Sequence, residues 1–148
     1  MTPTVRVQAG PFDMAAELAL LLAGRTDIGG VGAFLGVVRD STGDLVALTL
    51  EHYPGMTERA LAAIAAEATQ RWDLIGCTVL HRHGRLEPGA PIVLVLTASL
   101  HRQAALDSTA FLIDWLKTRA PFWKHEERSG GAHWVEARIE DESAAARW

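Results

Sequence analysis

The sequence predicts an α+β fold in which hairpins form a mainly antiparallel sheet and helices flank it. Strand-like segments occur in pairs joined by turn residues, and helical patterns separate the pairs instead of alternating strictly with single strands. The 148 residues, 49% of them hydrophobic, suit one globular domain with a substantial core. We therefore expect a single domain over residues 1–148.

The first part of the chain combines a strand, a helix and a hairpin. Val5–Gln8 alternates between apolar and polar residues, which predicts a short strand. A helix follows as far as Gly24, with Asp13 as its N-cap. The apolar, Gly-rich strand Ile28–Val38 and the alternating strand Leu45–His52 are separated by turn residues. These two strands are expected to form a hairpin.

The middle of the chain contains two helices and a second hairpin. A helix is expected over Thr57–Trp72, with its first residue as the cap. The β-rich segments Cys77–His81 and Ile92–Ala98 are predicted to pair as a hairpin. A long helix then covers His101–Arg119, and Pro121 ends it because proline disfavours helix at the preceding residue.

The C-terminal part is predicted to be less regular. Phe122 and Trp123 follow the helix end and are expected to be buried, which would hold Lys124 in a fixed direction. A polar loop is expected over Glu126–Ala132, followed by a short strand at Trp134–Glu136 and an Ala-rich terminal helix.

Composition excludes several classes of function. The net charge of −4 argues against broad nucleic-acid binding. No apolar run approaches the roughly 18–20 residues that span a bilayer, and the N-terminus has no apolar signal region. We therefore expect a cytoplasmic protein without a membrane partner. The single cysteine permits no internal disulfide and no Cys-rich metal site.

Cationic residues nevertheless gather at the predicted ends of elements. Arg39 ends a strand, and His101 and Arg102 lie at the start of the long helix. A helix N-terminus attracts anions, so these positions favour one phosphate or carboxylate group; solvated surface charges are the alternative. The segment 101–125 contains four Lys or Arg residues but only two Asp residues, so it carries a local excess of positive charge.

Two lysines lie on either side of the predicted helix end. Lys117 lies off the apolar stripe of the long helix, and Lys124 follows the aromatic pair. A lysine held against aromatic rings and beside other cations has a lowered pKa, which suits a nucleophile or an acid–base group. The alternative is that both lysines are surface charges. Glu126 is a possible partner of Lys124, in either a structural or a catalytic role.

The remaining motifs point to no cofactor and no metal. His81 and His83 alternate on a strand without a third ligand nearby, which makes a poor metal site. Neither a dinucleotide-binding loop nor a P-loop is present. Cys77 lies in an apolar strand without adjacent cations, so we expect it to be a buried hydrophobe instead of a reactive thiolate. Any sulfur handled by this protein must then come from elsewhere.

Six segments, in order along nearly the whole chain, resemble the MoaE family, the catalytic (large) subunits of molybdopterin synthase. They are Gly32–Asp40, Leu50–Thr57, His81–Gly84, Ser99–Arg102, Leu116–Lys124 and Trp134–Arg138. The runs Glu-His-Tyr-Pro-Gly-Met and Lys-Thr-Arg-Ala-Pro-Phe-Trp-Lys are the most specific. For the fold, the resemblance implies an α/β-hammerhead-like arrangement.

The resemblance implies a sulfurtransferase of molybdenum cofactor biosynthesis. Such an enzyme converts cyclic pyranopterin monophosphate into molybdopterin by inserting two sulfurs as a dithiolene. The sulfur arrives as a thiocarboxylate on the C-terminal Gly-Gly of a small ubiquitin-like subunit. Two catalytic subunits form a homodimer at the core of a heterotetramer, with one small subunit at each end.

The resemblance also implies a role for individual residues. The family's anion-binding residues correspond to Arg39, His101, Arg102 and Arg138, which would hold the substrate phosphate and the tail carboxylate. Arg138 matches an arginine that would reach the pocket of the neighbouring subunit. Lys117 would act as acid–base or form a brief bond to the tail, and Lys124 would stabilise negative charge or position the pterin. Glu126 matches a supporting acidic residue.

Two other functions stay open at this point. One is a non-catalytic anion-binding or scaffold subunit that binds a ubiquitin-like tail. The other is the same enzyme binding an unrelated ubiquitin-like tail.

Overall fold

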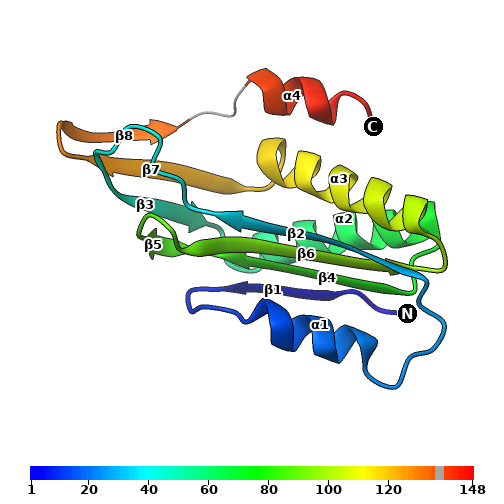
Figure 1. The fold of residues 1–148 in the computed structure, drawn as a ribbon. Helices are drawn as coiled ribbons and strands as arrows, with labels where there is room; N and C mark the ends of the chain where they lie inside the picture. The colour runs from blue at the N-terminus through cyan, green and yellow to red at the C-terminus, as the bar shows by residue number, and fades with distance from the viewer. Residues whose placement is uncertain (136–138) are drawn as a thin grey trace.

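Two four-stranded β-sheets form the framework in the computed structural model, which describes residues 1–135 and 139–148 (Figure 1). The central sheet contains, in spatial order, β1 (Thr4–Gln8), β4 (Gly76–Arg82), β6 (Pro91–Ser99) and β2 (Gly30–Val37). The end sheet contains β5 (Gly84–Leu86), β3 (Leu45–His52), β7 (Phe122–Arg128) and β8 (Gly131–Val135). The helices are α1 (Met14–Leu22), α2 (Met56–Trp72), α3 (Arg102–Thr118) and α4 (Ile139–Ala145).

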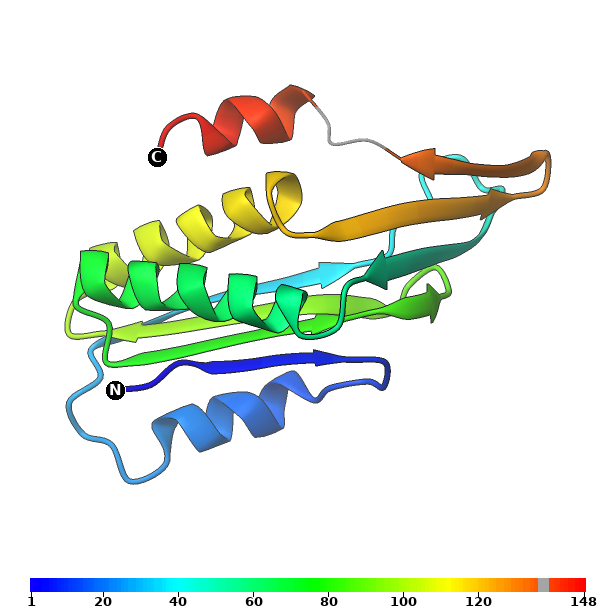
Figure 2. The ribbon, with the colours of Figure 1, turned by 180° about the vertical axis from the view of Figure 1, so that it is seen from behind.

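Helices cover both faces of the central sheet. Helix α1 lies on one face, and α2 and α3 lie on the other (Figures 1 and 2). Because side chains alternate along a strand, Leu80 and Leu94 pack toward α1, whereas Val79 and Val95 face the core below α2 and α3. The α+β class is therefore confirmed, with two sheets where the sequence suggested one.

The contact between β2 and α3 is unusually close. Gly32 of β2 faces the backbone of Ala105, and a Cβ atom at residue 32 would collide with the Ala105 carbonyl group and the Thr109 hydroxyl group. On the neighbouring strand, the Thr97 hydroxyl group donates to the Ala105 carbonyl oxygen over 2.8 Å. These contacts fix where α3 lies on the sheet.

Helix starts follow the predictions in one case and not in the other. Asp13 caps α1 as expected, accepting from the backbone N–H groups of Ala15 and Ala16 at 2.9 and 3.2 Å. Thr57 is not the cap of α2, because Gly55 occupies that position. The Thr57 side chain is buried instead and donates to the Tyr53 carbonyl oxygen over 2.9 Å.

One predicted hairpin is confirmed and the other is wrong. Strands β4 and β6 pair antiparallel from Gly76–Ala98 to His81–Val93. Strands β2 and β3, expected to pair with each other, lie in different sheets: β2 pairs with β6, and β3 pairs with β5 and β7. The turn between them is formed as its residues indicate, with Asp40 accepting from Gly43 N–H over 2.8 Å. Turn residues set the local path of the chain, but they do not choose the partner of each strand.

The predicted polar loop over Glu126–Ala132 is also wrong. Strand β7 continues to Arg128, a turn occupies residues 129–130, and β8 begins at Gly131. Pairing with β3 satisfies the backbone, while Arg128 binds the carboxylates of Asp44 and Glu126 at 2.7 Å each. A strand can therefore carry this many charges when they pair with each other. The predicted terminal helix is present as α4.

Candidate active site

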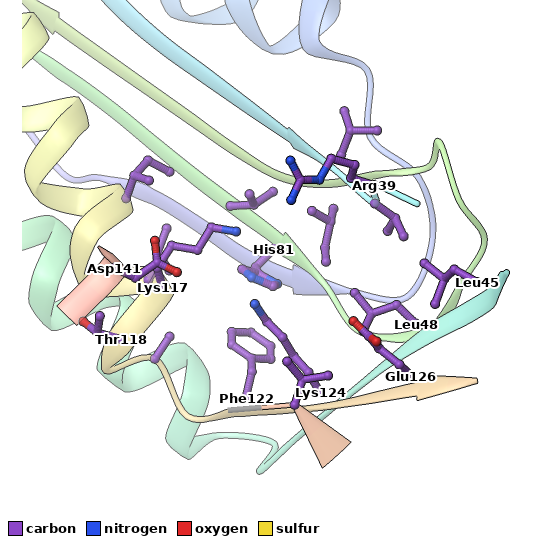
Figure 3. A pocket seen from close by; sticks show the side chains of 18 residues that line it. Arg39, Leu45, Leu48, His81, Lys117, Thr118, Phe122, Lys124, Glu126 and Asp141 are labelled. Atoms are coloured by element: carbon purple, nitrogen blue, oxygen red, sulfur yellow. The ribbon is translucent and has the colours of Figure 1, made fainter. Parts of the chain in front are cut away.

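A cavity of about 400 Å³ lies where the ends of several elements meet (Figure 3). Its lining includes four of the predicted site residues: Arg39, Lys117, Lys124 and Glu126. Topology explains the convergence of the first two. Strands β2 and β4 both run antiparallel to β6, so both end at the same edge of the central sheet. Helix α3 starts at the opposite end of the sheet and returns, so that Lys117 lines the same cavity as Val37 and Arg39 at the end of β2.

The end of α3 and the start of β7 hold the two lysines. The N–H group of Arg119 donates to the Trp115 carbonyl oxygen over 2.7 Å, which closes the last turn of α3. Phe122 N–H then donates to the Ala120 carbonyl oxygen over 2.8 Å, and Pro121 directs the chain into β7. Lys117 thus lies in the last turn of a helix, where the helix dipole favours a cation.

Alternation along β7 divides its side chains between two faces. Phe122, Lys124 and Glu126 line the cavity, as expected for residues two apart on a strand. Phe122 is partly buried, as predicted. Trp123 points the other way; it is 45% exposed and packs edge-on against Tyr53, so the prediction that it is buried is wrong.

Burial lowers the pKa of the Lys124 ammonium group, and the positive charge of Lys117 lowers it further. The carboxylates of Asp141 and Glu126 oppose this shift without cancelling it. The predicted lowered pKa is therefore confirmed for Lys124. A lysine of this kind supplies a neutral amine at lower pH than a solvated one does.

Glu126 does not pair with Lys124, the partner that the sequence suggested, but with Arg128 and His133. Its carboxylate pairs with Arg128 at 2.7 Å and lies 3.7 Å from His133. Within the described residues, neither lysine nor Arg39 has a carboxylate within 4.0 Å. Three cationic side chains thus line one cavity, and none of them has a direct ion-pair partner among the described side chains, which favours an anionic ligand there.

The other predicted substrate-binding residues lie elsewhere. His101 and Arg102 line a separate hollow at the N-terminus of α3. At 1.5 Å per residue, Arg102 and Lys117 are about 22 Å apart along the helix axis. Arg138, the remaining prediction, lies outside the described residues.

Two titratable residues of the cavity lining, His81 and Asp141, were not among the predicted site residues. His81 lies near the end of β4 on the same face as Val79, a placement that strand alternation alone would give. Asp141 reaches the cavity from α4, which lies beside α3 (Figure 1). No sequence signal indicates Asp141, because its position depends on how the C-terminal helix packs.

Cys77 is a buried core residue, as predicted, and burial raises the pKa of its thiol to about 12. Within residues 1–135 and 139–148, no three His, Cys, Asp or Glu side chains gather where a metal ion could bind. The helices of these residues include none that is long and apolar enough to cross a bilayer. The cytoplasmic location stays a prediction.

Comparisons with known proteins point to one family. Residues 7–119 match the family model described as MoaE protein. The chain is 56% identical to the molybdopterin synthase catalytic subunit of Mesorhizobium japonicum, covering 100% of this chain and 94% of that protein. It is 54% identical to the protein of the same name from Cereibacter sphaeroides, covering 97% and 99%.

A solved structure agrees with these matches. The molybdopterin biosynthesis MoaE protein from Burkholderia ambifaria superposes with a TM-score of 0.85, at 49% identity, over 99% of this chain and 98% of that chain. The family match, the sequence identity and the shared fold all point to the same family. The chain belongs to the MoaE family, the molybdopterin synthase catalytic subunits.

Proposed function

We propose that this protein is the catalytic subunit of a molybdopterin synthase and acts as a sulfurtransferase. It transfers sulfur from the C-terminal thiocarboxylate of a small ubiquitin-like subunit to cyclic pyranopterin monophosphate, which gains a dithiolene. The observation that carries this proposal is the convergence of Arg39, Lys117 and Lys124 on one cavity in a chain of this family.

The three cations have different settings, which suggests different roles. Arg39 lines the cavity, is exposed and carries a fixed charge, which suits the substrate phosphate or the tail carboxylate. Lys117 is our choice for the catalytic group, as acid–base or in a brief bond to the tail. Lys124, half-buried, stabilises developing negative charge or positions the pterin. Glu126 supports the site by orienting Arg128 beside it.

His101 and Arg102 enter this proposal through a second copy of the chain, and the resemblance to the MoaE family implies the same for Arg138. A separation of about 22 Å between Arg102 and Lys117 is too long for both to hold one small substrate within the same subunit. In the proposed homodimer, the His101–Arg102 pair of one subunit serves the cavity of the other. This dimer forms the core of a heterotetramer with one small subunit at each end.

Reconstitution tests the function directly. The protein is mixed with a thiocarboxylated small subunit and cyclic pyranopterin monophosphate, and the dithiolene product is measured. We expect product only when all three components are present. As a control, the same small subunit must yield product with another catalytic subunit. If this protein then binds the small subunit and the pterin but forms no product, the alternative, a non-catalytic anion-binding scaffold, is supported.

A further inference from the structure

His81 lies between the two lysines without having been assigned a role. Its side chain is 7% exposed, and its ring stacks on that of Phe122 with centroids 3.9 Å apart and planes 19° apart. Because Phe122 and Lys124 lie on the same face of β7, this stack places the imidazole on the side from which Lys124 projects. Figure 3 shows the end of Lys124 pointing toward the His81 ring, while Lys117 extends into the same cavity from α3.

The tautomer of His81 follows from its hydrogen bond. Its Nδ1 atom lies 2.8 Å from the Arg82 carbonyl oxygen, which can only accept, so Nδ1 carries the proton and donates. Burial lowers the pKa of the ring to about 4, and the charges of Lys124 and Lys117 act in the same direction. The ring is therefore neutral near pH 7, and Nε2 holds a lone pair. No hydrogen bond within the described residues reaches Nε2.

We propose that His81 is a positioning residue whose Nε2 atom accepts a hydrogen bond from the Lys124 ammonium group and holds it toward the cavity. This role of His81 rests on the proposed function, which makes the cavity the site of sulfur transfer. A neutral acceptor at this place orients a cation without adding a third positive charge beside Lys117 and Lys124.

This hydrogen bond affects the pKa of the Lys124 ammonium group. An acceptor favours the ammonium form, so His81 opposes the effects of burial and of Lys117 on the pKa of Lys124. Among the side chains that the structure describes, the other charged or titratable groups around this place are Arg39 after β2, His52 of β3, Glu126 of β7 and Asp141 of α4. All of them stay unchanged in the variants below.

Three substitutions distinguish the proposed contact of Nε2 with Lys124 from the structural contacts of His81, which are the hydrogen bond of Nδ1 to Arg82 and the stack on Phe122. In His81→Asn, the amide keeps a donor near Nδ1 for the Arg82 carbonyl oxygen but loses the acceptor at Nε2. In His81→Gln, the longer side chain brings an amide oxygen close to the position of Nε2. In His81→Phe, the stack on Phe122 is kept and both nitrogen atoms are lost. His83→Asn is the matched control, because His83 packs against His52 with the ring planes tilted by 45° and does not line the cavity.

The first measurement needs neither substrate nor partner. The ionisation of Lys124 is followed by the pH dependence of its modification with acetic anhydride, resolved by peptide mass. We expect it to shift down by about one pH unit in His81→Asn and His81→Phe, the size of one hydrogen bond to a charged group. His81→Gln and His83→Asn should keep the wild-type ionisation.

The second measurement is sulfur transfer by the reconstituted enzyme. We expect kcat to fall about tenfold in His81→Asn and His81→Phe, and His81→Gln to stay within about threefold of wild type. An unchanged Lys124 ionisation in His81→Asn, or an equal loss in all three variants, would show that His81 is merely structural. Absence of product from the wild-type enzyme would instead contradict the proposed function, while the ionisation result still decides the role of His81.

Discussion

Lys117 and Lys124 differ in the backbone that carries them and in how deeply they lie. Lys117 is exposed at the end of a helix, whereas Lys124 is half-buried on a strand whose other face is partly open to solvent. The first position leaves an amine free to move with a reacting group. The second fixes an amine against the cavity wall, where a charge is less shielded by water.

Replacing each lysine by alanine and by arginine tests this division. Lys117→Ala and Lys117→Arg should both lower kcat/KM for dithiolene formation by at least about 100-fold, because arginine keeps the charge but cannot give up a proton. Lys124→Arg should retain more activity than Lys124→Ala if Lys124 supplies only charge. Arg119→Ala, a neighbouring cation outside the cavity lining, is the control. Full sulfur transfer by Lys117→Ala would make our assignment wrong.

Cys77 should be dispensable for sulfur transfer. Its thiol is buried, and a pKa of about 12 leaves almost no thiolate near neutral pH. We expect Cys77→Ser to keep wild-type activity per mole of folded protein while losing about 1–2 kcal/mol of unfolding free energy, since a hydroxyl group is placed in the core. A variant that folds but forms no dithiolene would contradict the view that sulfur comes only from the partner.

His81 should also make the free energy of unfolding depend on pH. Its pKa is about 4 in the folded protein and near 6.5 when unfolded, so between these values the unfolded state binds more protons. The free energy of unfolding should therefore fall as pH decreases from about 6.5 to about 4, by about 3 kcal/mol from this residue. Urea unfolding at several pH values should show a shallower decline for His81→Asn. Parallel curves for the two proteins would contradict this.

At the scale of elements, β7 shows how pairing overrides local composition. Phe-Trp-Lys-His-Glu-Glu-Arg has the charge of a surface loop, yet it pairs with β3 from His52–Phe122 to Leu45–Arg128. This pairing is what makes Phe122, Lys124 and Glu126 share a face. A loop in the same place would hold none of them in a fixed direction.

The close contact of β2 with α3 is the element-scale feature most open to a test. Gly32→Ala places a methyl group against the Ala105 carbonyl group and Thr109, so α3 must shift. We expect a loss of about 1–3 kcal/mol in unfolding free energy, measured by urea denaturation. In Gly130→Ala, nothing lies within 4 Å of the added Cβ, so the change should stay within about 0.5 kcal/mol. Similar losses of unfolding free energy in both variants would show that the close contact of β2 with α3 does not require a glycine at residue 32.

At the scale of the whole molecule, α3 separates the predicted anion-binding residues into two places. Its N-terminal end carries His101 and Arg102, and its C-terminal end carries Lys117. Two places on one chain can serve one substrate only if two chains combine. The functional unit that we propose is therefore larger than this subunit.

Mixing two inactive variants tests for such shared sites. Lys117→Ala and Arg102→Ala should each be inactive as homodimers. If each site uses Lys117 of one subunit and Arg102 of the other, a mixed dimer contains one intact site and one doubly altered site. Unfolding and refolding the two variants together should then restore dithiolene formation, up to about one quarter of wild-type activity in a statistical mixture. No recovery, with mixed dimers shown to be present, would place both residues in the same subunit's site.

The sequence by itself determined the α+β class, the capping of α1 by Asp13, the β4–β6 pairing and four residues of the cavity, Arg39, Lys117, Lys124 and Glu126. The fold features follow from local periodicity and turn chemistry, and the cavity residues from charges at element ends together with the resemblance to the MoaE family. Only the tertiary structure decided that β2 and β3 lie in different sheets, that β7 is a strand, and that Asp141 reaches the cavity. Each of these depends on which distant segment supplies a strand's hydrogen bonds or covers a helix, and no local pattern in the chain specifies that choice.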